Sequence, residues 1–185
     1  GRYRSTFDVH LTQPGTYRIA VAAHGVFASY KVDGERKRMR GTAEDLKTKI
    51  PANAEEVRIS ESWRRMETYV TAGAPTKTVL EPTGKGLEIV PVTHPNDLFS
   101  GETGKFRLLM DGKPAGNVKV EVIRGGIRYR DQLGDRTVET GEDGSFEVTW
   151  AEPGMYWISA EFQDDKASIE GAQRRAMCAV TLEVL

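Results

Sequence analysis

The sequence predicts an all-β protein made of tandem immunoglobulin-like β-sandwiches, and two observations carry this prediction. The first is a series of short alternating segments separated by turn-forming residues, clearest from residue 87 onward. The second is an internal repeat, in which residues 13–17 (QPGTY) resemble residues 152–156 (EPGMY). Each copy follows an alternating strand pattern and precedes a longer one, which indicates two copies of one architecture.

Residues 87–185 show the pattern of one complete immunoglobulin-like sandwich. A turn at residues 111–114 separates two runs of alternating apolar residues, Phe106, Leu108 and Met110 before it and Val118, Val120 and Val122 after it. Such alternation on both sides of a turn predicts paired strands with one buried face. Further strands are expected near 87–92, 146–150, 156–162 and 174–185, with a hairpin of 127–131 and 136–140.

Tyr17 and Tyr156 each stand two residues after the glycine of the repeated segment. This is the position of the tyrosine corner at the start of the sixth strand of an immunoglobulin-like sandwich, where the hydroxyl can bond back to the backbone. We therefore interpret both tyrosines as structural residues.

Residues 1–74 are expected to be the C-terminal part of a first sandwich that is incomplete at its N-terminus, because its first four strands should lie upstream of Gly1. Phe7–Leu11 is predicted to pair with Tyr17–Ala23, in a sheet separate from those of the second sandwich. Another strand is expected near 64–72. Residues 75–86 contain two prolines and two glycines, which predicts a linker between the two domains.

Residues 25–62 are predicted to be a partly helical insertion in the first sandwich. Their charged stretch, 31–40, is expected to be a solvated loop. The alternative, an anion site, is disfavoured because no aromatic residues interleave with the basic ones. Thr42 and Asp45 form a capping pair, which predicts a short helix over 43–49 that ends before Pro51.

Net charge, hydropathy and cysteine content argue against a nucleic-acid-binding protein, a membrane-spanning helix and a disulfide-bonded fold. The net charge of −1 gives no overall electrostatic reason to expect nucleic acid as a partner. No apolar run approaches the roughly 20 residues that a membrane-spanning helix needs. The single cysteine, Cys178, cannot form an intrachain disulfide, and its apolar strand neighbours predict a buried, unreactive thiol.

The usual catalytic signatures are missing, which predicts a protein that is not an enzyme. The sequence has neither the G-x-S-x-G nucleophile motif nor the H-E-x-x-H zinc motif. Its carboxylates are plentiful, but none stands in an apolar setting that would tune a general acid. Catalytic residues are therefore not assigned.

His94 and Asp97 are the candidate metal ligands, because they place an imidazole and a carboxylate in one loop close to the predicted linker. The alternative is that residues 95–97 simply form a turn, and two ligands without a third favour that alternative. The other histidines, His10 and His24, fall too far apart in the predicted hairpin to share one ion.

Trp157 and Met155 are the candidate surface residues of the second sandwich. Tyr156 and Ile158 should face the core, so Met155 and Trp157 should point to the opposite face. That face could pack on the first domain, or it could contact a partner or a glycan. Domain packing is favoured, because two sandwiches joined by so short a linker should touch.

Three stretches carry a resemblance to a known family: 82–102 (PTGKGLEIVPVTHPNDLFSGE), 106–122 (FRLLMDGKPAGNVKVEV) and 140–157 (TGEDGSFEVTWAEPGMYW). They resemble a bacterial secreted family of unknown function that is described as a periplasmic component of nickel or cobalt uptake. The resemblance implies two β-sandwich domains, export to the periplasm, and a metal ion or a membrane uptake complex as partner. Residues 111–114 and 142–146 also resemble the transthyretin-like modules that are appended to many secreted enzymes.

We therefore predict an exported, non-enzymatic binding or accessory module, with nickel or cobalt uptake as the role that the resemblance implies. No metal is required for the predicted fold. The alternative prediction is an adhesive or glycan-binding β-sandwich module that uses the face of Trp157.

Overall fold

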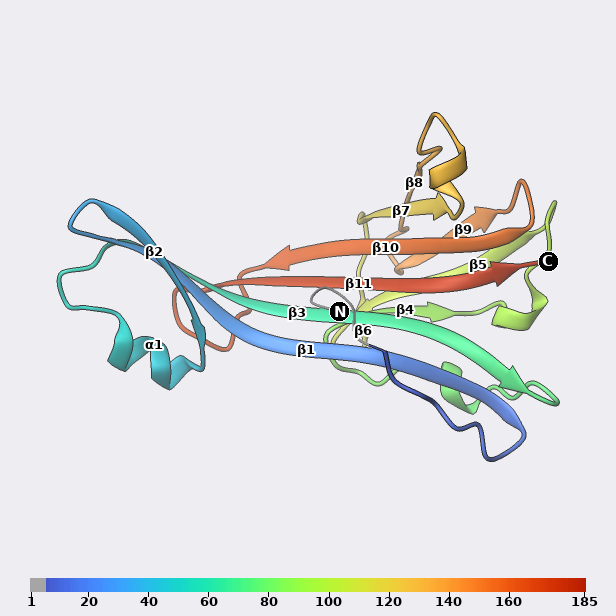
Figure 1. The fold of residues 1–185 in the computed structure, drawn as a ribbon, viewed down its shortest axis with the longest axis horizontal. Helices are drawn as coiled ribbons and strands as arrows, with labels where there is room; N and C mark the ends of the chain where they lie inside the picture. The colour runs from blue at the N-terminus through green and yellow to red at the C-terminus, as the bar shows by residue number, and fades with distance from the viewer. Residues whose placement is uncertain (1–5) are drawn as a thin grey trace.

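The structure is a computed structural model that describes residues 6–185, and it confirms a predominantly β fold with sandwiched sheets (Figure 1). One sheet has seven strands in the order β2-β1-β3-β11-β10-β7-β8, and β4, β5, β6 and β9 form the other. In chain order the elements are β1 (Gly15–Val32), β2 (Glu35–Gly41), α1 (Ala43–Lys49), β3 (Glu55–Ala72), η1 (Thr78–Leu80), β4 (Leu87–Pro91), η2 (Pro95–Asp97), β5 (Thr103–Met110), β6 (Lys113–Pro114), β7 (Lys119–Arg124), η3 (Ile127–Tyr129), β8 (Arg136–Glu139), β9 (Ser145–Thr149), β10 (Gly154–Asp164) and β11 (Gln173–Val184). No helix among residues 6–185 is long and apolar enough to cross a membrane.

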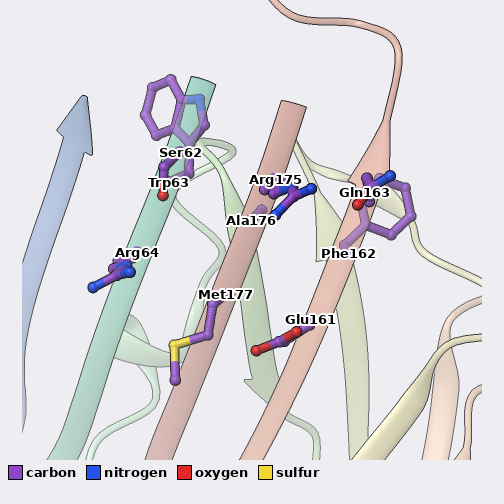
Figure 2. A pocket seen from close by; sticks show the side chains of 9 residues that line it. All are labelled: Ser62, Trp63, Arg64, Glu161, Phe162, Gln163, Arg175, Ala176 and Met177. Atoms are coloured by element: carbon purple, nitrogen blue, oxygen red, sulfur yellow. The ribbon is translucent and has the colours of Figure 1, made fainter. Parts of the chain in front are cut away.

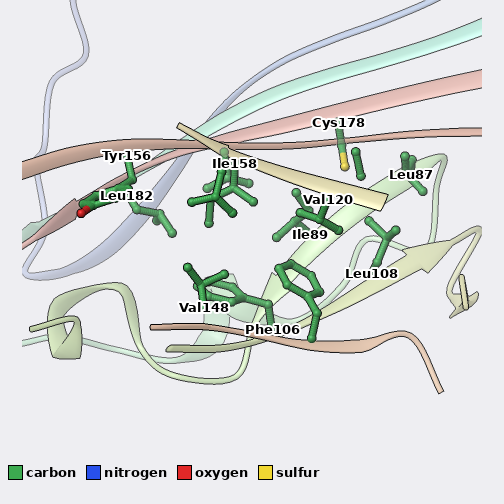
Figure 3. Close-up of a cluster of buried hydrophobic side chains, with 14 of the residues drawn as sticks. Leu87, Ile89, Phe106, Leu108, Val120, Val148, Tyr156, Ile158, Cys178 and Leu182 are labelled. Atoms are coloured by element: carbon green, nitrogen blue, oxygen red, sulfur yellow. The ribbon is translucent and has the colours of Figure 1, made fainter. Parts of the chain in front are cut away.

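The main hydrophobic core lies between the two sheets, in the half of the chain after residue 87 (Figure 3). The predicted alternation on both sides of the turn at 111–114 holds, since Phe106 and Leu108 on β5 and Val120 and Val122 on β7 are all buried. The core is rich in aromatic rings, with Phe106 and Phe146 stacked at 5.3 Å between centroids. Burial of this continuous apolar surface is the main stabilising contribution to the fold.

The repeated segments adopt the same local structure in both halves of the chain. The Tyr17 hydroxyl donates a hydrogen bond to the Gln13 carbonyl, and the Tyr156 hydroxyl donates to the Glu152 carbonyl, each at 2.8 Å. The preceding glycines, Gly15 and Gly154, have φ of 135° and 134°. Residues other than glycine rarely adopt this backbone conformation, which explains why glycine occupies both positions.

The two halves share one sheet, so the prediction that they lie in separate sheets is wrong. β3 pairs in parallel with β11 from Ser60↔Gln173 to Thr68↔Thr181. β1 then joins the same sheet by pairing antiparallel with β3. The physical reason is that β11 would otherwise be an edge strand with unpaired backbone groups, and β3 pairs with those groups.

The predicted hairpin between Phe7–Leu11 and Tyr17–Ala23 is also wrong. Residues 6–12 are exposed and outside the strands, and Tyr17 pairs with Val70 of β3. β1 pairs with β3 along nearly the whole length of β1, whereas residues 7–11 could pair with only one end of β1. The longer ladder satisfies more backbone groups.

The region predicted as an insertion, 25–62, forms an extended arm made of the far ends of β1 and β3 together with β2 and α1 (Figure 1). The predicted helix is present, and its N-terminus has the capping box of Thr42 and Asp45. The predicted loop at 31–40 is wrong, because β1 and β2 form a hairpin there. Asp33 and Gly34, with φ of 53° and 80°, form its tight turn.

The arm has a small hydrophobic core of its own. Its buried residues come from β1 and α1 and are Val26, Ala28, Tyr30, Val32 and Leu46. The side chain of Ile169, from the loop between β10 and β11, packs against this cluster. The arm is therefore attached to the rest of the chain by side-chain packing as well as by strand pairing.

The predicted hairpin of 127–131 with 136–140 is not formed. Residues 127–129 form the short helix η3, and β8 pairs with β7 through Val120↔Val138. β7 thus has β8 as a second neighbour in the sheet, in addition to β10.

The segment predicted as a linker, 75–86, lies against the sheet and is held by buried charge. Glu88, 1% exposed, accepts hydrogen bonds from the backbone N–H groups of Thr83 and Gly84 at 2.9 and 2.8 Å. Arg65 of β3 donates to Thr83 and forms an ion pair with buried Glu67 at 2.8 Å. These contacts join the segment firmly to β3.

Candidate functional site

His94, one of the two predicted metal ligands, is buried and fully hydrogen-bonded. Its Nδ1 accepts a hydrogen bond from the Asn96 N–H at 3.1 Å. Its Nε2 lies 3.1 Å from the Thr76 carbonyl oxygen and 3.2 Å from the Thr16 hydroxyl. A carbonyl oxygen only accepts, so Nε2 carries the proton. Neither ring nitrogen has a free lone pair, because one is protonated and the other accepts a hydrogen bond.

Asp97, the second predicted ligand, lies at the end of η2 with an exposed side chain. Among residues 6–185 no group of three or more histidine, cysteine, aspartate or glutamate side chains is arranged to hold a metal ion. His94 instead joins β1, the segment before η1 and the start of η2. Nickel or cobalt binding at these two residues stays a prediction without further support from their geometry.

Cys178 is buried in the main core, as predicted. Burial raises the pKa of its thiol, and the nearby carboxylate of Glu67 raises it further. A thiol in this setting stays protonated and does not act as a nucleophile at neutral pH.

A buried carboxylate in the arm links three separate parts of the chain. Glu61, 3% exposed, accepts hydrogen bonds from the N–H and hydroxyl of Ser168 at 2.6 and 3.0 Å, and lies 2.7 Å from His24 Nε2. The His24 ring stacks on Trp63 at 4.0 Å. Although burial opposes it, hydrogen bonding from Ser168 and His24 lowers the pKa of Glu61.

This cluster contains a serine, a histidine and a carboxylate, but it is not arranged for nucleophilic catalysis. Ser168 and His24 both bind to Glu61. In a catalytic triad the histidine must accept the proton of the serine, and the carboxylate must contact the histidine from its other side. Here the serine proton points to the carboxylate, so the cluster fits a structural role.

Trp157 and Met155 lie on the outer face of the seven-stranded sheet, where the sequence placed them. Trp157 is half-buried, and Met155 is 47% exposed. In the ladder Trp157 stands between Ile123 of β7 and Thr181 of β11. β1 and β3 join the sheet on the side of β11 that is opposite to β10. The strand order therefore places the first half beside this face, whereas the favoured prediction was that it packs on top of it.

An apolar groove of about 400 Å³ surrounds Trp157. Ile127, from η3, and Leu133, from the loop before β8, complete its wall and are 53% and 44% exposed. Sequence reasoning missed these two residues because it placed them in a hairpin. Apolar residues beside a turn are unusual, and this feature of the sequence could have identified Ile127 and Leu133 as surface candidates.

Comparisons with known proteins give a family but no activity. A search of curated proteins finds no match. Among solved structures, the D0–D1 domain of intimin matches at 10% identity with a TM-score of 0.28, covering 92% of this chain and 97% of the intimin chain. Residues 1–164 match the family described as a domain of unknown function, DUF4198. Since the match covers most of the chain, this protein belongs to the DUF4198 family.

Proposed function

We propose that this chain is a non-enzymatic binding module, and that the groove around Trp157 is its contact with a partner protein. The observation that carries the proposal is the groove itself, an apolar hollow on an open sheet face. Large apolar side chains gathered at one exposed place commonly mark an interaction site. From the sequence resemblance alone, we also propose that the protein is exported.

The chemistry of the lining favours a protein partner over a glycan. Sites for sugars combine an aromatic platform with several polar groups that fix the hydroxyls. In this groove the polar side chains are few, and the Arg124 guanidinium already donates to the Pro153 carbonyl at 2.8 and 3.1 Å. An apolar side chain of a partner protein would instead gain about 1.5–3 kcal/mol from full burial.

Position-specific photocrosslinking in the source cells tests this proposal. A photoreactive amino acid at position 127 should capture a partner, and the same group at Val57 serves as control. Val57 is comparably exposed, at 43%, but lies on the arm. The captured protein is then purified, and its affinity for the chain is measured with and without Met155→Asp.

We expect Met155→Asp to weaken binding of the purified partner at least tenfold, because a buried, unpaired carboxylate is costly. Val57→Asp should leave the affinity unchanged. Equal binding by both variants would refute the groove as the contact. A glycan-array signal that Met155→Asp abolishes would favour the alternative, a glycan-binding module.

A further inference from the structure

Positive charge is concentrated on the outer face of the sheet where the arm begins. The arginines there are Arg38 and Arg40 on β2, Arg58 and Arg64 on β3, and Arg175 on β11. All are exposed. The chain as a whole has a net charge of −1, so these cations are segregated on one face rather than reflecting a basic protein.

Strand register arranges these arginines around small, hydroxyl-bearing side chains. Ser29 of β1 lies between Arg38 and Arg58 in one cross-strand row. Two rows further along, Ser62 of β3 stands beside Arg175. The result is a groove of about 610 Å³, whose polar lining is Ser29, Arg38, Arg58, Ser60, Ser62, Arg64, Gln173 and Arg175. Among residues 6–185, no carboxylate lines it.

A second hollow, of about 320 Å³, continues the groove across β3, β11 and β10 (Figure 2). Arg64 and Arg175 project from neighbouring strands at its border and belong to both hollows. Gln163 and the carboxylate Glu161 stand on β10 at its far side. The basic lining therefore ends at β10.

In the part of the chain that the structure describes, none of these five arginines has a carboxylate within 4 Å. Each of the five is missing from the ion pairs that the described side chains form. One row away on the same face, Lys31 and Arg36 both pair with Glu56. Unpaired like charges on one face repel each other, and a bound anion would relieve this repulsion.

We propose that this groove binds an acidic polysaccharide through its sulfate or phosphate groups. The planar guanidinium presents paired N–H donors that match the geometry of such oxyanions. Arg38 and Arg175 lie three strands apart, roughly 14 Å at a strand spacing of ~4.8 Å, and four residues apart along the strands, a further ~13 Å at ~3.3 Å per residue. A single small anion cannot span that distance, whereas a polymer with repeated anionic groups can.

The lining favours a polysaccharide over a nucleic acid. Proteins that bind single-stranded nucleic acids stack bases on open aromatic rings. Phe27, the aromatic residue of this groove, is covered by the Arg40 guanidinium, which lies 5.4 Å from the ring centroid. Trp63 and Phe162, which border the second hollow, pack against the main core. The serine hydroxyls between the arginines supply donors and acceptors for sugar hydroxyls instead.

Titration with oligosaccharides tests the proposal on the full chain. The probes are a heparin oligosaccharide for sulfate, a phosphomannan fragment for phosphate, dextran as an uncharged sugar, and single-stranded DNA of equal charge. The test variant is Arg58→Ala/Arg175→Ala. Its control is Lys37→Ala/Lys47→Ala, which removes the same charge from exposed positions of β2 and α1 that do not line the groove.

We expect at least one acidic oligosaccharide to bind in a salt-dependent manner, and the arginine double variant to bind it at least tenfold more weakly. The lysine double variant should stay within about twofold of wild type, and both should keep the unfolding temperature of wild type. Equal losses in both variants, equal affinity for dextran, tighter binding of the DNA, or no binding by wild type would each overturn the proposal.

Discussion

The arm and the sandwich are built from similar strands yet depend on different interactions. In the sandwich, two sheets enclose a core that includes fully buried Trp150 and Phe106. In the arm, one sheet and the single helix α1 enclose a few residues around Leu46. The same local motif, a glycine followed by a tyrosine that bonds backward, begins β1 and β10. The difference shows that a shared turn does not determine how many layers form around it.

The two regions also differ in the surfaces that they leave open. The sandwich end of the outer sheet face is apolar around Trp157, whereas the arm end is lined with unpaired arginines. A second sheet or domain covers neither end in the described part of the chain. One continuous sheet can thus carry two chemically distinct binding surfaces, and the predictions below test how far the two regions depend on each other.

The largest effect is expected for Phe106→Ala. Removing this buried ring should lower the free energy of unfolding by about 3–5 kcal/mol, because it leaves a cavity between the two sheets. Leu46→Ala is the comparison, and it should loosen only the arm. Thermal unfolding followed by tryptophan fluorescence measures both, and equal effects on the main transition would mean that the regions unfold as one unit.

A smaller effect is expected for His94→Ala, which removes three hydrogen-bond contacts of a buried ring. It should lower the free energy of unfolding by about 1–3 kcal/mol, since Thr76 and Thr16 would lose a partner. Binding of Ni²⁺ should not change. Calorimetric titration of wild type and variant with Ni²⁺ decides this, and loss of a wild-type binding event would restore His94 as a ligand.

The two tyrosines compare the halves directly. Tyr156→Phe should cost about 0.5–1.5 kcal/mol, the usual contribution of a hydrogen bond at a partly buried site. Tyr17→Phe should cost less, because its bond to Gln13 is exposed to water. Urea unfolding measures both changes, and a larger loss for Tyr17 would mean that the first half depends more on this motif.

The smallest effect is a dependence on pH in the arm. The pKa of Glu61 is lowered in the folded state from 4.5, so its contribution to stability is present above that value and lost as pH falls through the folded pKa. The stability difference between wild type and Glu61→Gln should therefore shrink below about pH 4.5. Chemical unfolding from pH 7 to pH 3 measures it, and a constant difference would show that the carboxylate charge does not matter.

Sequence patterns predicted the local elements better than their partners. The capping pair Thr42 and Asp45 gave the helix, and alternation gave β5, β7, β9 and β10, because these signals depend on residues close in the chain. The alternation pattern did not predict the pairing of β3 with β11. The backbone groups at the edge of a strand can pair with any extended segment, so they do not specify a partner. The pairs that join distant parts of a sheet are not encoded in a local period.

In the candidate surfaces, too, local patterns predicted the orientation of single residues but not the contacts between distant segments. Trp157 was placed on the correct face by alternation alone, but Leu133 joins it only through the path of a loop. The charged stretch 31–40 was predicted as a loop because its basic residues hide the alternation of the hairpin. Arg38 and Arg175 line one groove although their strands are far apart in the sequence, which no spacing rule could predict.

Amide hydrogen exchange of the intact protein tests the continuous sheet most directly. If β3 pairs with β11, amides of β3 between Ser60 and Thr68 that face β11 should be as strongly protected as those of Val180 and Leu182. Amides in residues 6–12, which lie outside the strands, should exchange fast. Exchange of the β3 amides as fast as that of residues 6–12 would contradict the continuous sheet and, with it, the arginine groove that spans β3 and β11.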